Sequence, residues 1–198
     1  KPVTLLWTFP SFLVVHGSEA LRSVADLAVL GKAKPGGLSY VSTGVATGGH
    51  LLGEMFRTRS GLAMVHVPYK GAAPAIVDLV AGRADFFFVS YASASGHIAE
   101  GKLRALAVAT SNRLKRFPDI PTMAEAGFPN VEYVTWFGLI APAGTPDPII
   151  AKLNEEFARA ARSPVWVAIE RSLSSTPPWR KRWRASARSA SGVSMRSS

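Results

Sequence analysis

The hydrophobic positions of this chain alternate between short apolar runs and helical repeats, which predicts alternating strands and helices. Residues 86–88 are three consecutive phenylalanines, and such a run is typical of a strand buried on both faces. Pro10 separates two apolar runs near the start, and we expect it to interrupt the strand there. Strands are predicted at 3–8, 12–15, 38–42, 64–69, 85–90 and 103–110. Helices are predicted after Ser23 and at 50–59, 75–81, 92–100 and 146–162.

Local signals support several of these boundaries. Ser23 and Asp26 have the spacing of a capping box, with aspartate in the place of the usual glutamate or glutamine. Thr145 is expected to cap the last predicted helix. Repeated strand–turn–helix units indicate an α/β fold with a mostly parallel sheet. In such sheets ligands bind beyond the carboxyl ends of the strands, so the loops at those ends are the candidate sites.

The strongest candidate is the sequence STGVATGGH at residues 42–50, between a predicted strand and a predicted helix. Its glycines allow close approach to a ligand, and Thr47 is placed to cap the helix. The N–H groups of Gly48, Gly49 and His50 would then remain free for an anion. A tight connection without a ligand explains the pattern equally well. The spacing fits neither the phosphate-binding loop nor the dinucleotide-binding glycine motif.

Two further loops follow predicted strands. Tyr69 could form the wall of a pocket and Lys70 could attract an anion, or the tyrosine could pack between helices while the lysine is solvated. Ser90, after the phenylalanine run, could donate a hydrogen bond. Small hydroxyl and glycine residues at three strand ends favour polar recognition rather than acid–base chemistry.

The chain contains no cysteine, which excludes thiol nucleophiles, disulfides and cysteine-ligated metals. His50 and Glu54 stand four residues apart but lack the remaining residues of a helical zinc motif, and no nucleophile has a convincing setting. We therefore expect no catalytic residue, no metal and no cofactor. A hydrolase-like enzyme that uses His50 stays open as an alternative.

The net charge of +10 is concentrated at the end of the chain. After Glu170 there are seven basic residues and no acidic one, so residues 1–170 carry only about +3. The Ser/Arg-rich segment 174–198 is expected to be disordered, and its composition also resembles translation in a shifted frame. Nonspecific nucleic-acid binding through this tail is a second alternative. No apolar run reaches the roughly 18 residues that a membrane helix needs.

Several motifs resemble those of one known family, the substrate-binding proteins of tripartite tricarboxylate transporters, or Bug family. They are VHVPYKG at 65–71, GRAD at 82–85, GKLRALAV at 101–108, PDIPT at 118–122, EAG at 125–127, WFGL at 136–139 and APAGTP at 141–146. The motifs occur in the family's order and spacing, from about residue 3 to residue 169.

The resemblance implies a type II periplasmic-binding-protein-like fold, with one complete α/β lobe and a remnant of the other. Residues 1–9 and 133–173 would belong to the first domain and its hinge strands, and residues 10–132 to the second domain. Compared with the family, the chain starts about 100 residues late, roughly the size of one domain, and ends in an aberrant tail. We therefore expect weak or absent ligand binding by this polypeptide alone.

The implied function is extracytoplasmic capture of a small carboxylate, such as a di- or tricarboxylate, an amino acid or an aromatic acid. The implied partners are the membrane components of a tripartite tricarboxylate transporter, and the implied location is the periplasm. We expect a monomer that binds no specific nucleic acid. Ala46 and Val89 stand where many family members have glycine and aspartate. The expected ligand-binding residues are Ser42, Thr43, Gly44, Thr47, Gly48, Gly49, His50, Tyr69, Ser90 and Trp136.

Overall fold

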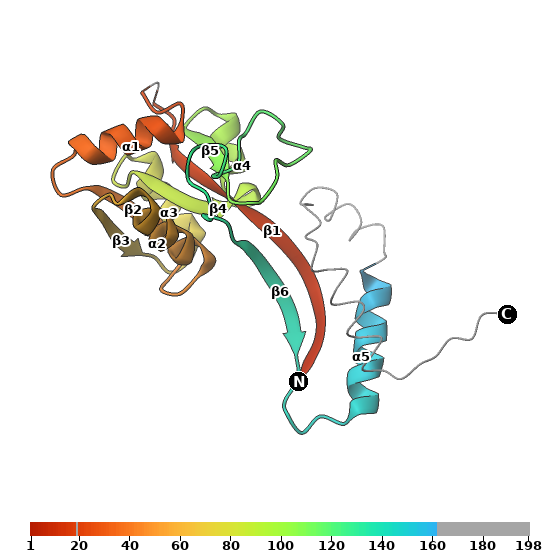
Figure 1. Cartoon of the computed structure of the whole chain (residues 1–198). Coiled ribbons are helices and arrows are strands. Elements are labelled where there is room, and N and C mark those ends of the chain that lie inside the picture. Colours follow the sequence, from red (N-terminus) through yellow and green to blue (C-terminus); the bar gives the residue numbers. More distant parts are fainter. Residues whose placement is uncertain (19, 162–198) are drawn as a thin grey trace.

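The computed structural model describes residues 1–18 and 20–161, which form an α/β lobe and a long two-stranded ribbon that leaves it (Figure 1). The predicted tail, 174–198, lies outside the described residues. The strands are β1 (Pro2–His16), β2 (Leu38–Ser42), β3 (Met64–Pro68), β4 (Phe86–Ser90), β5 (Leu103–Val108) and β6 (Val134–Ile140). The helices are α1 (Val24–Ala33), α2 (Gly48–Ser60), α3 (Ala72–Val80), α4 (Tyr91–Ala99) and α5 (Asp147–Ala160).

The lobe is built on a sheet with the strand order β3-β2-β4-β1-β5. Strand β2 pairs in parallel with β3 and β4, whereas β1 pairs antiparallel with β4 and β5. Four of the five strands therefore run in one direction, and β1 runs against them. The predicted mostly parallel sheet is therefore confirmed. Local patterns did not indicate that the long strand β1 would lie antiparallel between β4 and β5.

Helices cover both faces of this sheet, because alternate side chains of each strand point to opposite sides. Phe86 and Phe88 pack on the face that α1 and α2 cover, among Leu27, Leu52 and Phe56. Phe87 and Val89 pack on the other face, against Ile76 and Leu79 of α3 and Ala94 of α4. The expectation that the three phenylalanines are fully buried is confirmed, since each is at most 2% exposed.

Pro10 does not interrupt β1, contrary to expectation. The strand pairs with β6 from Pro2 to Pro10 and with β4 and β5 from Ser11 and Phe12 onward. Pro10 thus lies where the strand changes partners and has a single strand neighbour. A residue without an N–H is tolerated at such a position because only one side of the backbone is paired.

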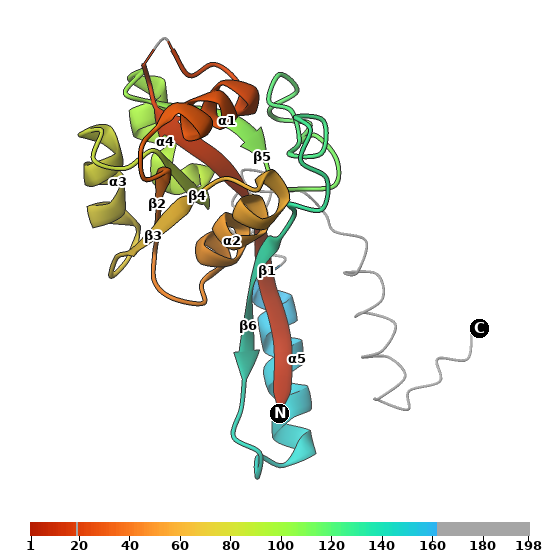
Figure 2. The ribbon, with the colours of Figure 1, turned by 60° about the vertical axis from the view of Figure 1, so that its left-hand side comes forward.

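Before Pro10, β1 pairs with β6 in the antiparallel ribbon that extends away from the lobe, with α5 beside it (Figures 1 and 2). Asn154 of α5 donates to the Val3 carbonyl oxygen at 2.6 Å, and Lys1 pairs with Asp147 at 2.7 Å. The residue before α5 is Pro146, and no side chain caps that end, so the predicted cap by Thr145 is wrong. The division of the chain into domains at residues 9/10 and 132/133 stays a prediction.

The capping box at α1 is present as predicted. The Ser23 hydroxyl accepts from the Asp26 N–H at 3.1 Å, and an Asp26 carboxylate oxygen accepts from the Ser23 N–H at 2.8 Å. The Ser23 hydroxyl and the Arg22 N–H also hydrogen-bond to Asp26 and hold the pKa of its carboxyl below the ordinary value.

Candidate functional site

Three strand-end loops meet at one edge of the sheet. Strands β3, β2 and β4 are adjacent and parallel, so the segments that follow Pro68, Ser42 and Ser90 leave from the same edge. The Tyr69 N–H donates to the Ser42 carbonyl oxygen at 3.0 Å, which joins the first two loops directly. The convergence expected from an α/β sheet is therefore present.

The segment 42–50, called here the 42–50 turn, is closed by hydrogen bonds of its own. The buried Ser42 hydroxyl donates to the Gly44 carbonyl oxygen at 2.9 Å and accepts from the Gly44 N–H at 3.1 Å. The Thr47 hydroxyl donates to the same carbonyl oxygen at 2.7 Å. The hydroxyl groups of Ser42 and Thr47 thus shape the turn.

Thr47 occupies the position before α2, but its hydroxyl does not cap the helix as expected, because it is committed to Gly44. Within the described residues, no side chain caps this end of α2. The helix's own hydrogen bonding begins with Leu51, whose N–H donates to the Thr47 carbonyl oxygen at 3.0 Å. The N–H groups of Gly48, Gly49 and His50 precede that bond, which is the arrangement that favours an anion at a helix N-terminus.

The two glycines that open α2 are required by close packing. A Cβ at Gly49 would lie 2.7 Å from the Phe88 carbonyl oxygen, and one at Gly48 would lie 2.8 Å from the Tyr133 ring and 2.9 Å from the Thr135 hydroxyl oxygen. Tyr133 and Thr135 therefore border the start of α2, a contact that no motif in the sequence indicated. Because alternate residues of a strand point to opposite faces, Trp136 points away from the side on which Thr135 meets Gly48.

His50 and His66 are brought together by the fold. Their rings are nearly parallel, at 11°, with centroids 4.0 Å apart. His66 is directly opposite Tyr40 in the β2–β3 register, and Tyr40 is opposite Phe86 in the β2–β4 register, so four rings form one stack across three strands and α2. No motif in the sequence indicated this contact, because the ring partners of His66 come from β2 and α2.

Each imidazole also holds the turn. The Ala46 N–H donates to Nδ1 of His50 at 3.0 Å, and Nε2 of His66 lies 2.7 Å from the Ser42 hydroxyl oxygen. Burial of the His66 ring, together with the neighbouring His50, lowers the pKa of His66, and Glu54 opposes this shift. The His50 side chain is therefore directed into the turn through Nδ1.

Glu54 is fully engaged and does not orient His50. It accepts from the Tyr40 hydroxyl at 2.7 Å and from the Arg57 guanidinium at 2.7 and 2.9 Å. Arg57, and after it Tyr40, holds the pKa of Glu54 below its ordinary value, while burial and then Glu54 raise the pKa of Tyr40. In the described part of the chain, no three His, Asp or Glu side chains are grouped closely enough to hold a metal ion.

The remaining expected site residues have structural partners or stand apart. The Tyr69 hydroxyl donates to Asp78, which also binds Arg83 at 2.7 Å, and the Tyr69 ring packs against the α3 side of the core. The hydrogen bond to Asp78 raises the pKa of Tyr69. Ser90 caps α4, with its oxygen 3.4 Å from the Ser93 N–H and 2.9 Å from the Ser93 hydroxyl. Thr43 is a half-buried residue of the 42–50 turn itself.

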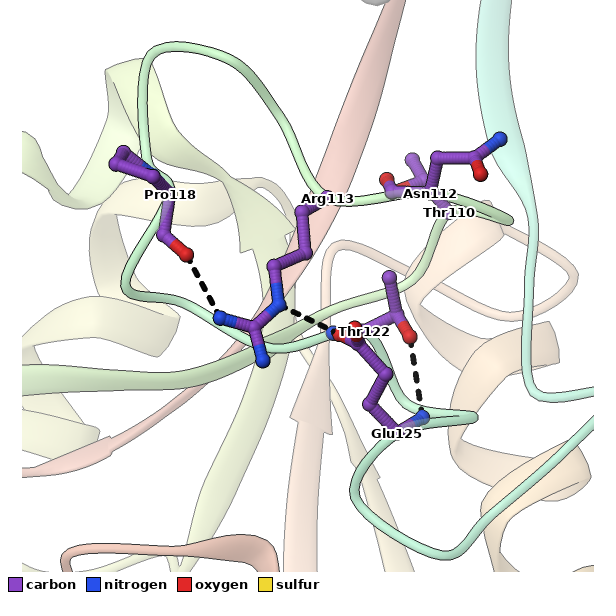
Figure 3. A network of polar contacts seen from close by, with 6 residues as sticks. All are labelled: Thr110, Asn112, Arg113, Pro118, Thr122 and Glu125. Carbon is purple, nitrogen blue, oxygen red and sulfur yellow. Dashed lines mark hydrogen bonds and ion pairs between the residues drawn. The ribbon is translucent and has the colours of Figure 1, made fainter.

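The long connection from β5 to β6 is held by the polar network in Figure 3, which joins Arg113, Pro118, Thr122 and Glu125. Glu125 accepts from the Thr122 N–H at 2.8 Å and from Arg113 at 2.8 Å, and its own N–H donates to the Thr122 hydroxyl at 3.1 Å. Arg113 also donates to the Pro118 carbonyl oxygen at 2.8 Å. Glu125 thus links Arg113 and Thr122 within this connection.

No helix among residues 1–18 and 20–161 is long and apolar enough to span a membrane. A family model described as the tripartite tricarboxylate transporter family receptor matches residues 1–180. The UPF0065 protein in the tcbD-tcbE intergenic region of Pseudomonas sp. strain P51 is 40% identical over 164 residues, which are 82% of this chain and 49% of that protein. BugT of Bordetella pertussis is 36% identical over 176 residues, which are 89% of this chain and 54% of BugT. The chain spans about half the length of these curated relatives.

Solved structures show the same fold. Rpa4515 of R. palustris, solved with adipate, has a TM-score of 0.80 and 33% identity, over 94% of this chain and 64% of that one. MatC of Rhodopseudomonas palustris, solved with bound malate, has a TM-score of 0.76 and 31% identity, over 82% of this chain and 55% of that one. The expected type II periplasmic-binding-protein-like fold is therefore confirmed. This chain belongs to the receptor family of the tripartite tricarboxylate transporters, which includes the Bug proteins.

Proposed function

We propose that this chain carries part of the binding site for a small carboxylate, in a periplasmic receptor that serves the membrane components of a tripartite tricarboxylate transporter. The observation that carries the proposal is the uncapped start of α2. There the N–H groups of Gly48, Gly49 and His50 follow a turn already closed by its own hydroxyl groups. A carboxylate oxygen is the kind of acceptor that such a group of donors takes.

The ligand class proposed is a dicarboxylate. Two relatives of similar fold were solved with adipate and with malate, and both ligands carry two carboxylate groups. The helix dipole contributes only about 0.3–1 kcal/mol toward binding one negative charge. The affinity therefore depends on further contacts, and we expect binding by the 198 residues alone to be weak. We propose that the receptor acts as a monomer.

We further propose that the chain performs no catalysis. As a general base, His50 would need a free nitrogen on the ligand side and an orienting carboxylate, but Nδ1 accepts from Ala46 and Glu54 is held by Tyr40 and Arg57. Ser42 and His66 have the 2.7 Å spacing of a nucleophile and its base. Ser42 is completely buried, however, and its hydroxyl proton is donated to Gly44, so it cannot reach a substrate.

A pair of substitutions at Ala46 tests the carboxylate site. Ala46 is exposed at the centre of the turn and has φ of 63°, a conformation that asparagine and aspartate accept better than most residues. Ala46→Asp places a negative charge beside the proposed ligand, and Ala46→Asn is its neutral match. A like charge at about 4 Å costs about 1 kcal/mol even in water, so adipate should bind at least about fivefold more weakly to Ala46→Asp than to Ala46→Asn.

The affinities can be measured by following amide chemical shifts during titration with adipate, a method that also detects weak binding. Salt should be held at physiological strength, so that the basic residues after Glu170 do not attract the ligand nonspecifically. Equal affinities for the two variants would contradict a site at this turn. Ala46→Asn serves as the control: if it still binds adipate, the substitution at position 46 has left the backbone of the turn intact.

A further inference from the structure

We propose that His50 and His66 position the 42–50 turn as a stacked pair, and that protonation of the pair releases the turn and weakens carboxylate binding. The effect on binding rests on the function proposed above, whereas the effect on the turn does not. Neither imidazole needs to touch the ligand, so both act as positioning residues.

The first contact concerns Nδ1 of His50. The Ala46 N–H donates to this nitrogen at 3.0 Å, so Nδ1 must carry a lone pair and the ring proton must be on Nε2. A proton added to Nδ1 would point at the Ala46 N–H, and the hydrogen bond would be lost. The observed turn therefore requires a neutral His50.

This hydrogen bond holds the one strained residue of the turn. Ala46 has φ of 63°, in the left-handed region that alanine avoids, and its side chain is exposed. A residue stays in such a conformation only when its surroundings hold it there. Loss of the bond to His50 would leave Ala46 free to relax, and Thr47 and Gly48 follow it directly at the start of α2.

The second contact holds the beginning of the turn. Nε2 of His66 lies 2.7 Å from the Ser42 hydroxyl oxygen, which donates its single proton to the Gly44 carbonyl oxygen at 2.9 Å. The His66 nitrogen must then be the donor. Ser42 is fully buried, so His66 reaches the turn from inside the lobe while His50 reaches it from α2.

The stack joins the two contacts. The ring centroids are 4.0 Å apart, so two protonated imidazoles would repel each other strongly. The pair therefore takes up a second proton much less readily than the first. The ionisable groups that act on the pair are Glu54 and Arg57 of α2 and Tyr40 of β2, which are bonded to one another. Glu54 attracts a proton to the pair, but for His66 burial and the neighbouring ring outweigh it.

The closed turn disfavours a proton on the pair, because Nδ1 of His50 must stay unprotonated to accept from Ala46, and because burial and the neighbouring His50 lower the pKa of His66. Above about pH 6.5 the ring is neutral in both the closed and the released turn. As the pH falls below that value, the released form takes up the proton first, because its imidazole keeps the ordinary pKa. Acid therefore shifts the equilibrium toward the released turn, between about pH 6.5 and the lower pKa of the packed ring.

The turn can be tested without ligand, by nitrogen-15 NMR of the full chain between pH 8 and pH 5. We expect the Ala46 amide signal to move as the pH falls, together with the ring nitrogens of His66, whose pKa is lowered. His50→Asn places an amide oxygen where Nδ1 lies and does not titrate, so the Ala46 signal should keep its neutral-pH position throughout. His50→Phe keeps the stack but removes the acceptor, and should shift the Ala46 signal at every pH. The control is His16→Gln, which removes a histidine at the far end of β1 and should leave the pH dependence of the Ala46 signal unchanged.

Binding is then measured with adipate at pH 7.5 and pH 5.5 in the unsubstituted chain and in His50→Asn. The protonation of adipate itself affects both proteins equally. The inference is supported if the loss of affinity from pH 7.5 to pH 5.5 is at least fivefold greater in the unsubstituted chain than in His50→Asn. An Ala46 signal that stays unchanged between pH 8 and pH 5 would overturn it, as would equal losses of affinity in the two proteins. A titrating Ala46 signal without adipate binding at either pH would support the positioning of the turn and overturn the proposed function.

Discussion

At the scale of single residues, the candidate site depends on one unfavourable backbone conformation. Ala46 and Asn130 are the two non-glycine residues with positive φ in the described residues, both at 63°. Asparagine accepts this region readily and alanine does not. The family resemblance puts glycine at position 46 in many members, and the φ of 63° gives the physical reason for that preference.

Replacing Ala46 by glycine should therefore stabilise the protein. The left-handed conformation costs a residue with a Cβ about 1–2 kcal/mol, and the greater chain entropy of unfolded glycine offsets part of the gain. We expect Ala46→Gly to raise the free energy of unfolding in urea by about 0.5–1 kcal/mol. Asn130→Gly is the matched control and should change it by less. A destabilised Ala46→Gly would show that position 46 is not strained.

Residue patterns predicted contacts that are local in sequence and missed those that depend on the fold. The capping box of Ser23 and Asp26 involves neighbours three residues apart, and it formed as expected. Thr47 had the same local signal, but its hydroxyl found the Gly44 carbonyl oxygen instead. The His50–His66 stack could not be predicted, because it requires the β2–β3 register and the start of α2 together.

At the scale of elements, strand positions were predictable and strand partners were not. The runs at 38–42 and 86–88 appear in β2 and β4, because burial on two faces leaves a continuous apolar signal. The sequence offered no means to see that β1 passes Pro10 and inserts antiparallel between β4 and β5. That pairing joins residues 11–16 to residues 86–90 and 103–108, far along the chain.

The carboxylate of Asp85 connects three of these elements through hydrogen bonds and an ion pair. Asp85, just before β4, is 12% exposed and accepts from the Lys34 ammonium at 2.7 Å, from the Ser39 N–H at 2.6 Å and from the Ser39 hydroxyl at 2.9 Å. Lys34 ends α1 and Ser39 lies in β2. The side chain therefore joins α1, β2 and β4 on the edge opposite the 42–50 turn.

Removing this carboxylate should weaken the lobe without changing the site. Asp85→Ala leaves the Ser39 N–H and the Lys34 ammonium unpaired, and we expect the free energy of unfolding to fall by about 2–3 kcal/mol. Urea unfolding measures this loss. The control is Asp119→Ala, on the exposed surface, which should stay within about 0.5 kcal/mol of the original protein. A fall in the free energy of unfolding of less than about 0.5 kcal/mol for Asp85→Ala would show that this carboxylate does not stabilise the lobe.

At the scale of the whole molecule, the ribbon of β1 and β6 connects the lobe to α5. This part exposes apolar side chains: Trp136 and Ile140 of β6 are 57% and 82% exposed, and Ile149, Leu153 and Phe157 of α5 are 51%, 37% and 37% exposed. The helical spacing of its apolar residues predicted α5, but within the described residues none of its side chains is buried. The lobe, by contrast, is packed on both sides of its sheet.

The central claim, that the start of α2 receives a carboxylate, is tested most directly by mapping amide shifts during titration of the full chain. With adipate, we predict saturating shifts of the Gly48, Gly49 and His50 amides, because their N–H groups precede the helical hydrogen bonds. The uncharged diamide of the same length should leave them unmoved. Adipate shifts that spare these three amides, or equal shifts with the diamide, would contradict the account.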